Sequence, residues 1–289
     1  MRLSGSGRHK ALNDQDIKFL VKSAEDDPKK SSVTLALELN DAKDKIVTCR
    51  TVQNVLKEAG FNYRVPRRLP LLSQKNISHR LQIANRWSNV PLNQWNRILF
   101  SDETKINLFS SDRRSNIWRK DGESLVMKNC TPTFKHGGGC VMVWGCMSAS
   151  GVGRLVFIDG IMDRYVYKRI LCENIQPSKE LLGLNDDFIF QHDNDPKHTS
   201  AYVKDFFKKP HINLLEWPAQ SPDLNPIEHL WDHVKREVRK ASPNNIKELR
   251  ETIVKIWDNI SPDICKNLVN TMPRRIEEIE RARGGHSSL

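Results

Sequence analysis

The sequence lacks any long hydrophobic run. No stretch approaches the roughly 18 consecutive apolar residues that a membrane-spanning helix needs. Residues 1–16, MRLSGSGRHKALNDQD, also contain no apolar core like that of a secretory signal. We therefore expect a protein with no membrane partner and see no sign of export.

Cysteine is scarce and scattered. The 289 residues include six cysteines, at positions 49, 130, 140, 146, 172 and 265, and none of them forms a C-x-x-C pair. This spacing argues against a zinc ribbon or a redox motif and favours reduced thiols inside the cell. The apolar fraction of 38% and the charged fraction of 28% are typical of one large or two ordinary globular domains.

Acidic residues are too few to balance the basic ones, which leaves a net charge of +11. The excess is concentrated in residues 1–95, which hold 17 Lys or Arg and 9 Asp or Glu. The remaining 194 residues carry a net charge of only +3. A basic segment before a nearly neutral body suggests a polyanion-binding module joined to another domain.

Apolar residues at helical spacing predict three short helices, over residues 14–26, 31–41 and 48–60. Thr48 is the expected cap of the third helix, and Gly60 is its expected end. Three short helices resemble a helix-turn-helix, although any three-helix bundle would fit. The basic flanks favour DNA binding. Candidate contacts are the polar residues on the third helix and the cations in its flanks: Arg8, Lys10, Arg50, Gln53, Asn54, Lys57, Arg64, Arg67 and Arg68.

A basic connector is predicted over residues 61–95. Its first part, residues 61–80, contains five cations and no acid: Arg64, Arg67, Arg68, Lys75 and Arg80. Such a run fits a solvated linker, a contact with DNA phosphates, or a nuclear import signal. The residues alone leave these three interpretations open.

From residue 96 the pattern changes to strands alternating with helices. The predicted order is three strands, then helix, strand, helix, strand and helix. Three consecutive strands with short links should be antiparallel, and strands joined through helices should be parallel to the first. This order predicts an α/β fold of the ribonuclease H-like kind, with a mixed five-stranded sheet, flanking helices and a small all-α domain in front.

Three acidic residues lie where this topology brings the chain together. Asp102 and Asp193 end the first and fourth strands, which should be neighbours, and Glu228 follows Pro226 in the first turn of the next helix. Three carboxylates at one place need a cation. Two Mg²⁺ ions, roughly 3.5–4 Å apart, fit carboxylate oxygens and would support cleavage of a phosphodiester.

Four motifs, in this order, resemble the Tc/mariner superfamily of DNA transposases on its Tc branch: LFSDETKINLF, HGGGCVMVWGCMS, QHDNDPKHTS and WPAQSPDLNPIEHLW. The family's catalytic triad is Asp, Asp and Glu with 34 residues between the last two, as between Asp193 and Glu228 here. The resemblance implies Asp102, Asp193 and Glu228 as catalytic metal ligands for Mg²⁺, with Mn²⁺ as a substitute.

The same resemblance implies cut-and-paste transposition. Strands would be cleaved at the terminal inverted repeats of a transposon, and the 3′-hydroxyl would then attack a TA target in double-stranded DNA. It further implies a dimer or larger assembly on DNA and a nuclear location. The expected domains are a helix-turn-helix with its linker (1–60), the connector (61–95), a catalytic domain (96–242) with a clamp-like insertion (108–139), and C-terminal helices (243–289).

One motif departs from the family pattern. The family begins with two helix-turn-helix units joined by a Gly-Arg-Pro-Arg linker, whereas this chain begins near that linker and reads GRHK, with His9 at the proline position. We therefore expect the first unit to be missing. A truncated or domesticated DNA-binding protein without activity is an alternative, and so is a plain ribonuclease H-like nuclease. The three acids favour an enzyme, and the helix-turn-helix favours a transposase.

Overall fold

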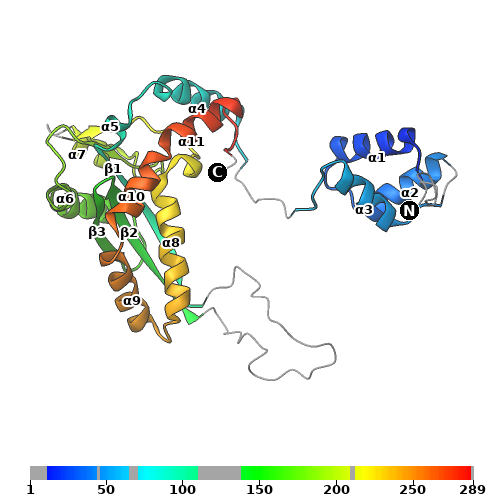
Figure 1. Cartoon of the computed structure of the whole chain (residues 1–289). Helices are drawn as coiled ribbons and strands as arrows, with labels where there is room; N and C mark the ends of the chain where they lie inside the picture. Colours follow the sequence, from blue (N-terminus) through cyan, green and yellow to red (C-terminus); the bar gives the residue numbers. More distant parts are fainter. Residues whose placement is uncertain (1–11, 44–45, 65–70, 110–137, 209–211, 288–289) are drawn as a thin grey trace, which may run out of the picture. The chain divides into compact units, whose positions relative to one another are not determined.

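The computed structural model describes residues 12–43, 46–64, 71–109, 138–208 and 212–287. The chain divides into two compact units, Met1–Arg68 and Leu69–Leu289, which are described separately here (Figure 1). Among the described residues, no helix combines the length and apolar character needed to cross a membrane. Residues 110–137, which make up most of the expected clamp-like insertion, lie outside the described residues.

The first unit contains the three predicted helices: α1 (Asp14–Asp26), α2 (Ser32–Lys43) and α3 (Cys49–Glu58). Thr48 caps α3 as expected, because its side chain accepts a hydrogen bond from the backbone N–H of Thr51. Gly60 follows α3 with a φ of +88°, a left-handed conformation that glycine adopts without strain.

Apolar side chains from all three helices form the core of the first unit. Leu20 of α1, Leu39 of α2 and Val52 of α3 are fully buried in one cluster. The opposite side of α3 faces solvent, where Arg50, Gln53, Asn54 and Lys57 are exposed. The periodicity that predicted a small helical domain is therefore confirmed.

The structure divides the segment that was expected to be a connector. Helix α4 (Gln74–Trp87) belongs to the second unit and packs against α11 (Met272–Arg281), nearly two hundred residues later in the chain. Ile83, Ala84 and Trp87 of α4 are buried in the core of that unit. The expected connector of residues 61–95 thus contains a helix that belongs to the core of the second unit.

The second unit is built on a mixed five-stranded sheet, as predicted. Its strands are β1 (Ile98–Asn107), β2 (Cys140–Ser148), β3 (Gly151–Ile158), β4 (Ile189–Gln191) and β5 (Asn213–Leu214). Their order across the sheet is β3-β2-β1-β4-β5. The first three pair antiparallel, whereas β4 runs parallel to both β1 and β5.

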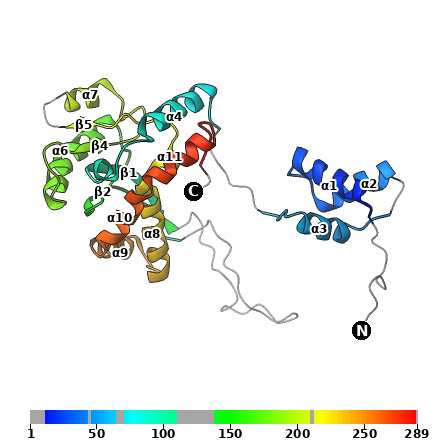
Figure 2. The ribbon, with the colours of Figure 1, turned by 45° about the horizontal axis from the view of Figure 1, so that its top comes forward.

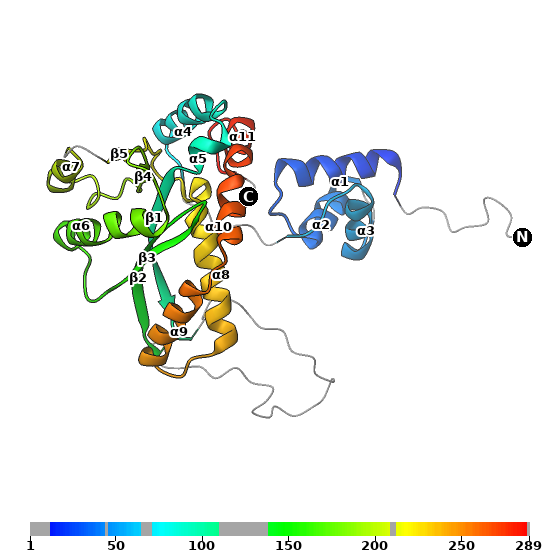
Figure 3. The same ribbon diagram turned by 60° about the vertical axis from the view of Figure 1, so that its left-hand side comes forward.

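Helices cover both faces of this sheet. They are α5 (Leu92–Trp95), α6 (Arg164–Leu181), α7 (Ala201–Phe207), α8 (Pro226–Ala241), α9 (Ile246–Asp258) and α10 (Pro262–Asn270), together with α4 and α11. Helices α6 and α8 lie on opposite sides of the strands (Figures 2 and 3). Successive residues of β1 accordingly enter different cores, with Phe100 packed on the α8 side and Leu99 on the α6 side.

A glycine in β2 allows two tryptophans to reach the sheet. Gly145 pairs with Asp102 of β1, and the stacked rings of Trp231 and Trp257, with centroids 5.0 Å apart, lie over it. A Cβ atom on Gly145 would approach Trp231 to 2.7 Å and Trp257 to 2.8 Å. Any larger residue must therefore displace two buried rings on helices α8 and α9.

We expect Gly145→Ala to lower the free energy of unfolding by about 1–3 kcal/mol, because overpacking a dense core forces rings and backbone to shift. Chemical denaturation checks this value. Cys140→Ala, at the exposed start of the same strand, is the control and should change the value by less than about 0.5 kcal/mol. Equal effects of the two substitutions would contradict the packing argument.

Candidate active site

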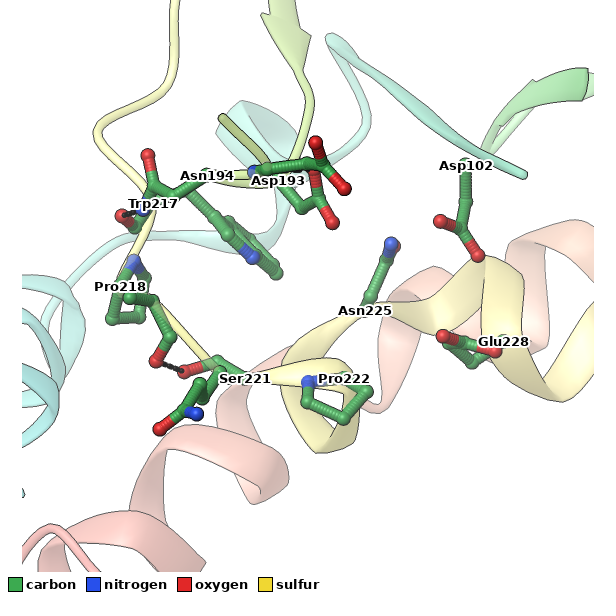
Figure 4. A pocket seen from close by; sticks show the side chains of 12 residues that line it. Asp102, Asp193, Asn194, Trp217, Pro218, Ser221, Pro222, Asn225 and Glu228 are labelled. Carbon is green, nitrogen blue, oxygen red and sulfur yellow. Dashed lines mark hydrogen bonds between the residues drawn. The ribbon is translucent and has the colours of Figure 1, made fainter. Parts of the chain in front are cut away.

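The three predicted carboxylates line one pocket of about 350 Å³ in the second unit. Asp102 and Glu228 face each other on one side of it, and Asp193 lies across from them (Figure 4). Asn194, Asp195, Asn225 and residues 217–222 complete the lining. The topology therefore brings Asp102, Asp193 and Glu228 to one place, as the sequence indicated.

Strand pairing explains why the two aspartates meet. In the parallel pairing of β1 and β4, Phe100 lies opposite Gln191. Asp102 and Asp193 each follow two residues later, beyond the last paired residues of β1 and β4. Asp193 lies past the end of β4, but β1 continues to Asn107 and Asp102 still pairs with Gly145 of β2, so the prediction that Asp102 ends its strand is wrong. At this point the Ser101 hydroxyl donates a 2.8 Å hydrogen bond to the carbonyl of Gln191, which marks the end of the regular pairing.

Glu228 is positioned by a sharp helix start. A 3₁₀ turn, Pro222–Leu224, is followed by Asn225 in an extended conformation and by Pro226 in the first turn of α8. Proline suits this position because it has no N–H to leave unsatisfied and its φ already matches a helix. The Glu228 carboxylate therefore projects into the pocket from the first turn of α8.

Two of the carboxylates are destabilised as anions. Burial, then the negative charges of Glu228 and Glu103, raise the pKa of Asp102 well above its usual range. Burial, with Asp232 nearby, raises the pKa of Glu228, and Lys235 opposes this effect. Among the described residues, Oδ2 of Asp102 is buried without a hydrogen-bond partner.

These carboxylates suit a hard divalent cation. Mg²⁺ prefers carboxylate and water oxygens and would remove the repulsion that keeps their pKa values high. No three His, Cys, Asp or Glu side chains stand close enough to form a ready metal cluster in the part of the chain that is described. The carboxylates share a pocket, and a cation would have to draw them together.

Asp193 has a different environment, because it is paired with a histidine. Nδ1 of His198 lies 2.5 Å from Oδ1 of Asp193, and Nε2 lies 3.4 Å from Oε1 of Glu103. Burial alone would lower the pKa of His198, but its bonds to the two carboxylates raise it to about 9. For Asp193 burial is the largest single effect and raises the pKa, but the hydrogen bond and charge of His198, the backbone N–H of Asp195 and the charge of Lys197 together lower it. His198 is therefore a buried cation that keeps Asp193 ionised.

An aromatic stack that no local sequence pattern indicates holds His198 in place. The ring of Tyr167 on α6 lies over His198 with centroids 3.7 Å apart. The Tyr167 hydroxyl is 3.1 Å from Nδ1 of His192. Burial, then the positive charge of His198, lower the pKa of His192 to about 4. His192 is thus neutral beside a charged neighbour.

Arg80 ties distant parts of the second unit to the start of α8. Its guanidinium is fully buried and makes two hydrogen bonds to the Asp223 carboxylate, of 2.9 and 2.7 Å. It also donates to the Ser221 hydroxyl and to the carbonyls of Gly284 and Gly285. Of the five cations in residues 61–80, Arg80 therefore fits none of the three interpretations left open for that run, because its side chain is buried in an ion pair.

The other predicted DNA-contacting residues belong to the first unit or its flank. Arg50, Gln53, Asn54 and Lys57 are all exposed on α3, and Gln53 donates a 3.0 Å hydrogen bond to Ser32. Arg64 is exposed as well. The remaining four, Arg8, Lys10, Arg67 and Arg68, lie outside the described residues.

Comparison with known proteins identifies two family models in the chain. Residues 18–89 match a helix-turn-helix model described as "Transposase", and residues 97–250 match one described as "DDE superfamily endonuclease". The Tcb2 transposable element transposase of Caenorhabditis briggsae is 38% identical over 266 residues, which cover 92% of this chain and 97% of that protein. The Tc1 transposase of Caenorhabditis elegans is 37% identical, with the same coverage.

The chain belongs to the Tc1/mariner family of transposases. The Mos1 transposase in its paired-end complex with the left transposon end has a similar structure, with a TM-score of 0.80 and 19% identity. That match covers 100% of this chain and 83% of the Mos1 chain. It confirms the ribonuclease H-like fold with a helical domain in front.

The matches correct the expectation that a helix-turn-helix unit is lacking. A helix-turn-helix region is present at residues 18–89, and the alignment with Tcb2 covers 97% of that relative. The expectation relied on the residues GRHK as the remnant of a linker between two units. The matched region instead begins within α1 and extends beyond α4, so it overlaps the second structural unit.

Breaking the Arg80–Asp223 pair should destabilise the fold. We expect Arg80→Leu to lower the free energy of unfolding by about 3–5 kcal/mol, because the Asp223 carboxylate stays buried without its cation. The matched control is Arg86→Ala on the same helix, whose pair with Glu216 is half exposed and should contribute less than about 1 kcal/mol. Denaturation curves showing equal losses would refute a special role for Arg80.

Stability should also depend on the charge of His198. The pKa of His198 is about 9 in the folded protein and near 6.5 in the unfolded chain. The stabilisation of the fold by the charge of His198 is therefore complete below about pH 6.5 and is lost as the pH rises through 9. We expect the parent to exceed His198→Gln in unfolding free energy by more at pH 6 than at pH 9.5, measured by denaturation in a metal chelator. A difference that stays constant with pH would show that His198 carries no charge here.

Proposed function

We propose that this chain is a cut-and-paste DNA transposase in which Asp102, Asp193 and Glu228 hold the catalytic metal ions. The observation that carries this proposal is the convergence of three carboxylates from β1, the end of β4 and the first turn of α8 on one pocket. Its support from relatives is the identity of about 37–38% with transposable element transposases over 92% of the chain.

The metal ions proposed are Mg²⁺ or Mn²⁺. Solved complexes of the Mos1 transposase are described with each of these ions, and the donor set here consists of the oxygens that both accept. Bound at this site, a pair of divalent cations would stabilise the negative charge that develops on the phosphoryl oxygens. Asp193, kept ionised by His198, is the carboxylate best prepared to receive a cation.

The residues divide the chemistry between them. Cleavage forms a bond from a water oxygen to phosphorus, and that water gives up a proton to solvent. The bond to a deoxyribose oxygen breaks, and this oxygen leaves with the electron pair and gains a proton from solvent. In strand transfer a 3′-hydroxyl takes the place of water. Asp102 and Glu228, whose raised pKa values favour protonation, must lose their protons before they bind a cation. Activity should therefore increase with pH through their titration.

The DNA substrate is proposed to be duplex DNA with terminal inverted repeats, inserted at TA sites. The exposed face of α3 carries Arg50, Asn54 and Lys57, which suit base edges and phosphates in a groove. The basic flanks of the first unit would add contacts to phosphates that do not depend on sequence. We propose a nuclear location and a dimer or larger assembly on DNA, in keeping with such a substrate.

Asp193→Asn should abolish Mg²⁺-dependent nicking of a terminal-repeat duplex, with a loss of at least a hundredfold, while DNA binding stays within about twofold. The amide keeps the shape of the carboxylate but removes the charge that holds the cation. A gel assay of nicking and a filter assay of binding measure the two effects.

Asp195→Asn is the matched control for this experiment. Asp195 lines the same pocket two residues later, but its carboxylate is paired with Lys197 at 2.8 Å. Its variant should retain nicking within a few-fold of the parent. If Asp193→Asn nicks as well as Asp195→Asn, the assignment of Asp193 as a metal ligand is wrong.

A further inference from the structure

One face of α8 carries a charge gradient that begins at Glu228. Residues spaced four, three and four apart share a face of a helix, and this row contains Glu228, Asp232, Lys235 and Arg239 in that order. The two acids lie at the catalytic end and the two cations lie farther along. Helix α8 packs beside β1, so the row follows the strand that carries Asp102.

The two cations of this row line a second pocket, and a third cation lines it as well. Lys105 of β1 and Lys235 and Arg239 of α8 line this pocket, which has a volume of about 90 Å³, together with Val238 and residues 106–108. No carboxylate forms a hydrogen bond or an ion pair with any of these three cations within the described ranges. Arg236 and Lys240, on the same helix, differ because both pair with Glu237.

The spacing along α8 fits the spacing of a nucleic acid backbone. At about 1.5 Å per residue, Lys235 lies about 10 Å and Arg239 about 16 Å along the helix from Glu228. One strand of DNA presents a phosphate about every 3.4 Å along its axis. The cations are therefore placed for roughly the third to the fifth phosphate from one held at Glu228.

The stabilisation of helix ends does not explain this arrangement. Cations in the last turn interact favourably with the helix dipole, and Arg239 and Lys240 share that benefit. Lys235 lies before the last turn, and Lys105 is on a strand. The three come from two elements and line one small pocket, farther along α8 than Glu228.

We propose that Lys105, Lys235 and Arg239 form a backbone track that binds the phosphates of the DNA strand cut at Asp102, Asp193 and Glu228. The inference rests on the proposed function and extends it, because it assigns a second DNA contact to the catalytic unit itself. The track holds the cleaved strand in register, so that the scissile phosphate meets the carboxylates. Contacts of this kind position a strand without reading its sequence.

The test compares two double variants of the full chain that remove the same charge from the same helix. Lys235→Ala with Arg239→Ala removes the track, and Arg236→Ala with Lys240→Ala removes the paired cations. The measurement is kcat/KM for nicking a terminal-repeat duplex as a function of salt. The track variant should show a slope of log kcat/KM against log salt that is shallower by about 1.8, or about 0.9 per lost phosphate contact. The control slope should match that of the parent.

A substrate series locates the contact. Single phosphates on the cleaved strand are replaced one at a time by neutral methylphosphonates, at the first to the sixth position from the scissile bond. The parent should lose at least about fivefold in kcat/KM when the third to fifth positions are neutral. The track variant should be insensitive at those positions. The Arg239→Ala variant alone should lose its sensitivity to the methylphosphonate at the fifth position. This variant keeps the charge of Lys235, which acts on Glu228.

The outcomes separate the two proposals. A parent chain that does not nick in Mg²⁺ refutes the proposed function. A parent that nicks, with both double variants showing equal slopes or equal methylphosphonate profiles, leaves the proposed function intact and refutes the track. Near-ultraviolet circular dichroism of the variants confirms that the exposed substitutions leave the fold unchanged.

Discussion

Repulsion between carboxylates is the constraint around which the second unit is organised. Asp102, Asp193 and Glu228 line one pocket, and Glu103 and Asp232 add further negative charge. Burial, and after it the like charges nearby, disfavour ionisation, which is why the pKa values of Asp102 and Glu228 are raised. Such an arrangement persists only where a rigid scaffold imposes it. The sheet, the two tryptophans over Gly145 and the buried Arg80 supply that rigidity.

A positive charge offsets this repulsion on only one side of β1. His198 bonds to Asp193 and faces Glu103, so the α6 side of β1 carries a local positive charge. The α8 side has no comparable cation among the described residues lining the pocket, and Asp102 and Glu228 remain destabilised as anions. Asp193 is therefore kept in its charged form, whereas ionisation of Asp102 and Glu228 would be favoured by an added cation. Lys235 acts on Glu228 only from farther along α8.

The sequence predicted the parts of the site that depend on local patterns and chain order. The strand pattern and the Pro226 helix start are local, and together with the topology they locate Asp102, Asp193 and Glu228, although Asp102 lies within β1 and not at its end. The Arg80–Asp223 pair joins residues 143 positions apart, and the stacking of Tyr167 on His198 crosses from α6 to the loop before α7. No periodicity encodes such contacts, and the pattern alone groups Arg80 with the other cations of residues 61–80.

The position of α4 shows what that grouping missed. The helix-turn-helix match extends to residue 89, yet α4 belongs to the second unit and packs on α11. Through Arg80 it holds Asp223, and the backbone N–H of Ser287 donates to the same carboxylate. The turn fixed by these bonds leads directly into Pro226 and Glu228. A segment that the helix-turn-helix match includes therefore packs in the second unit, and its buried Arg80 holds the turn that leads into Glu228.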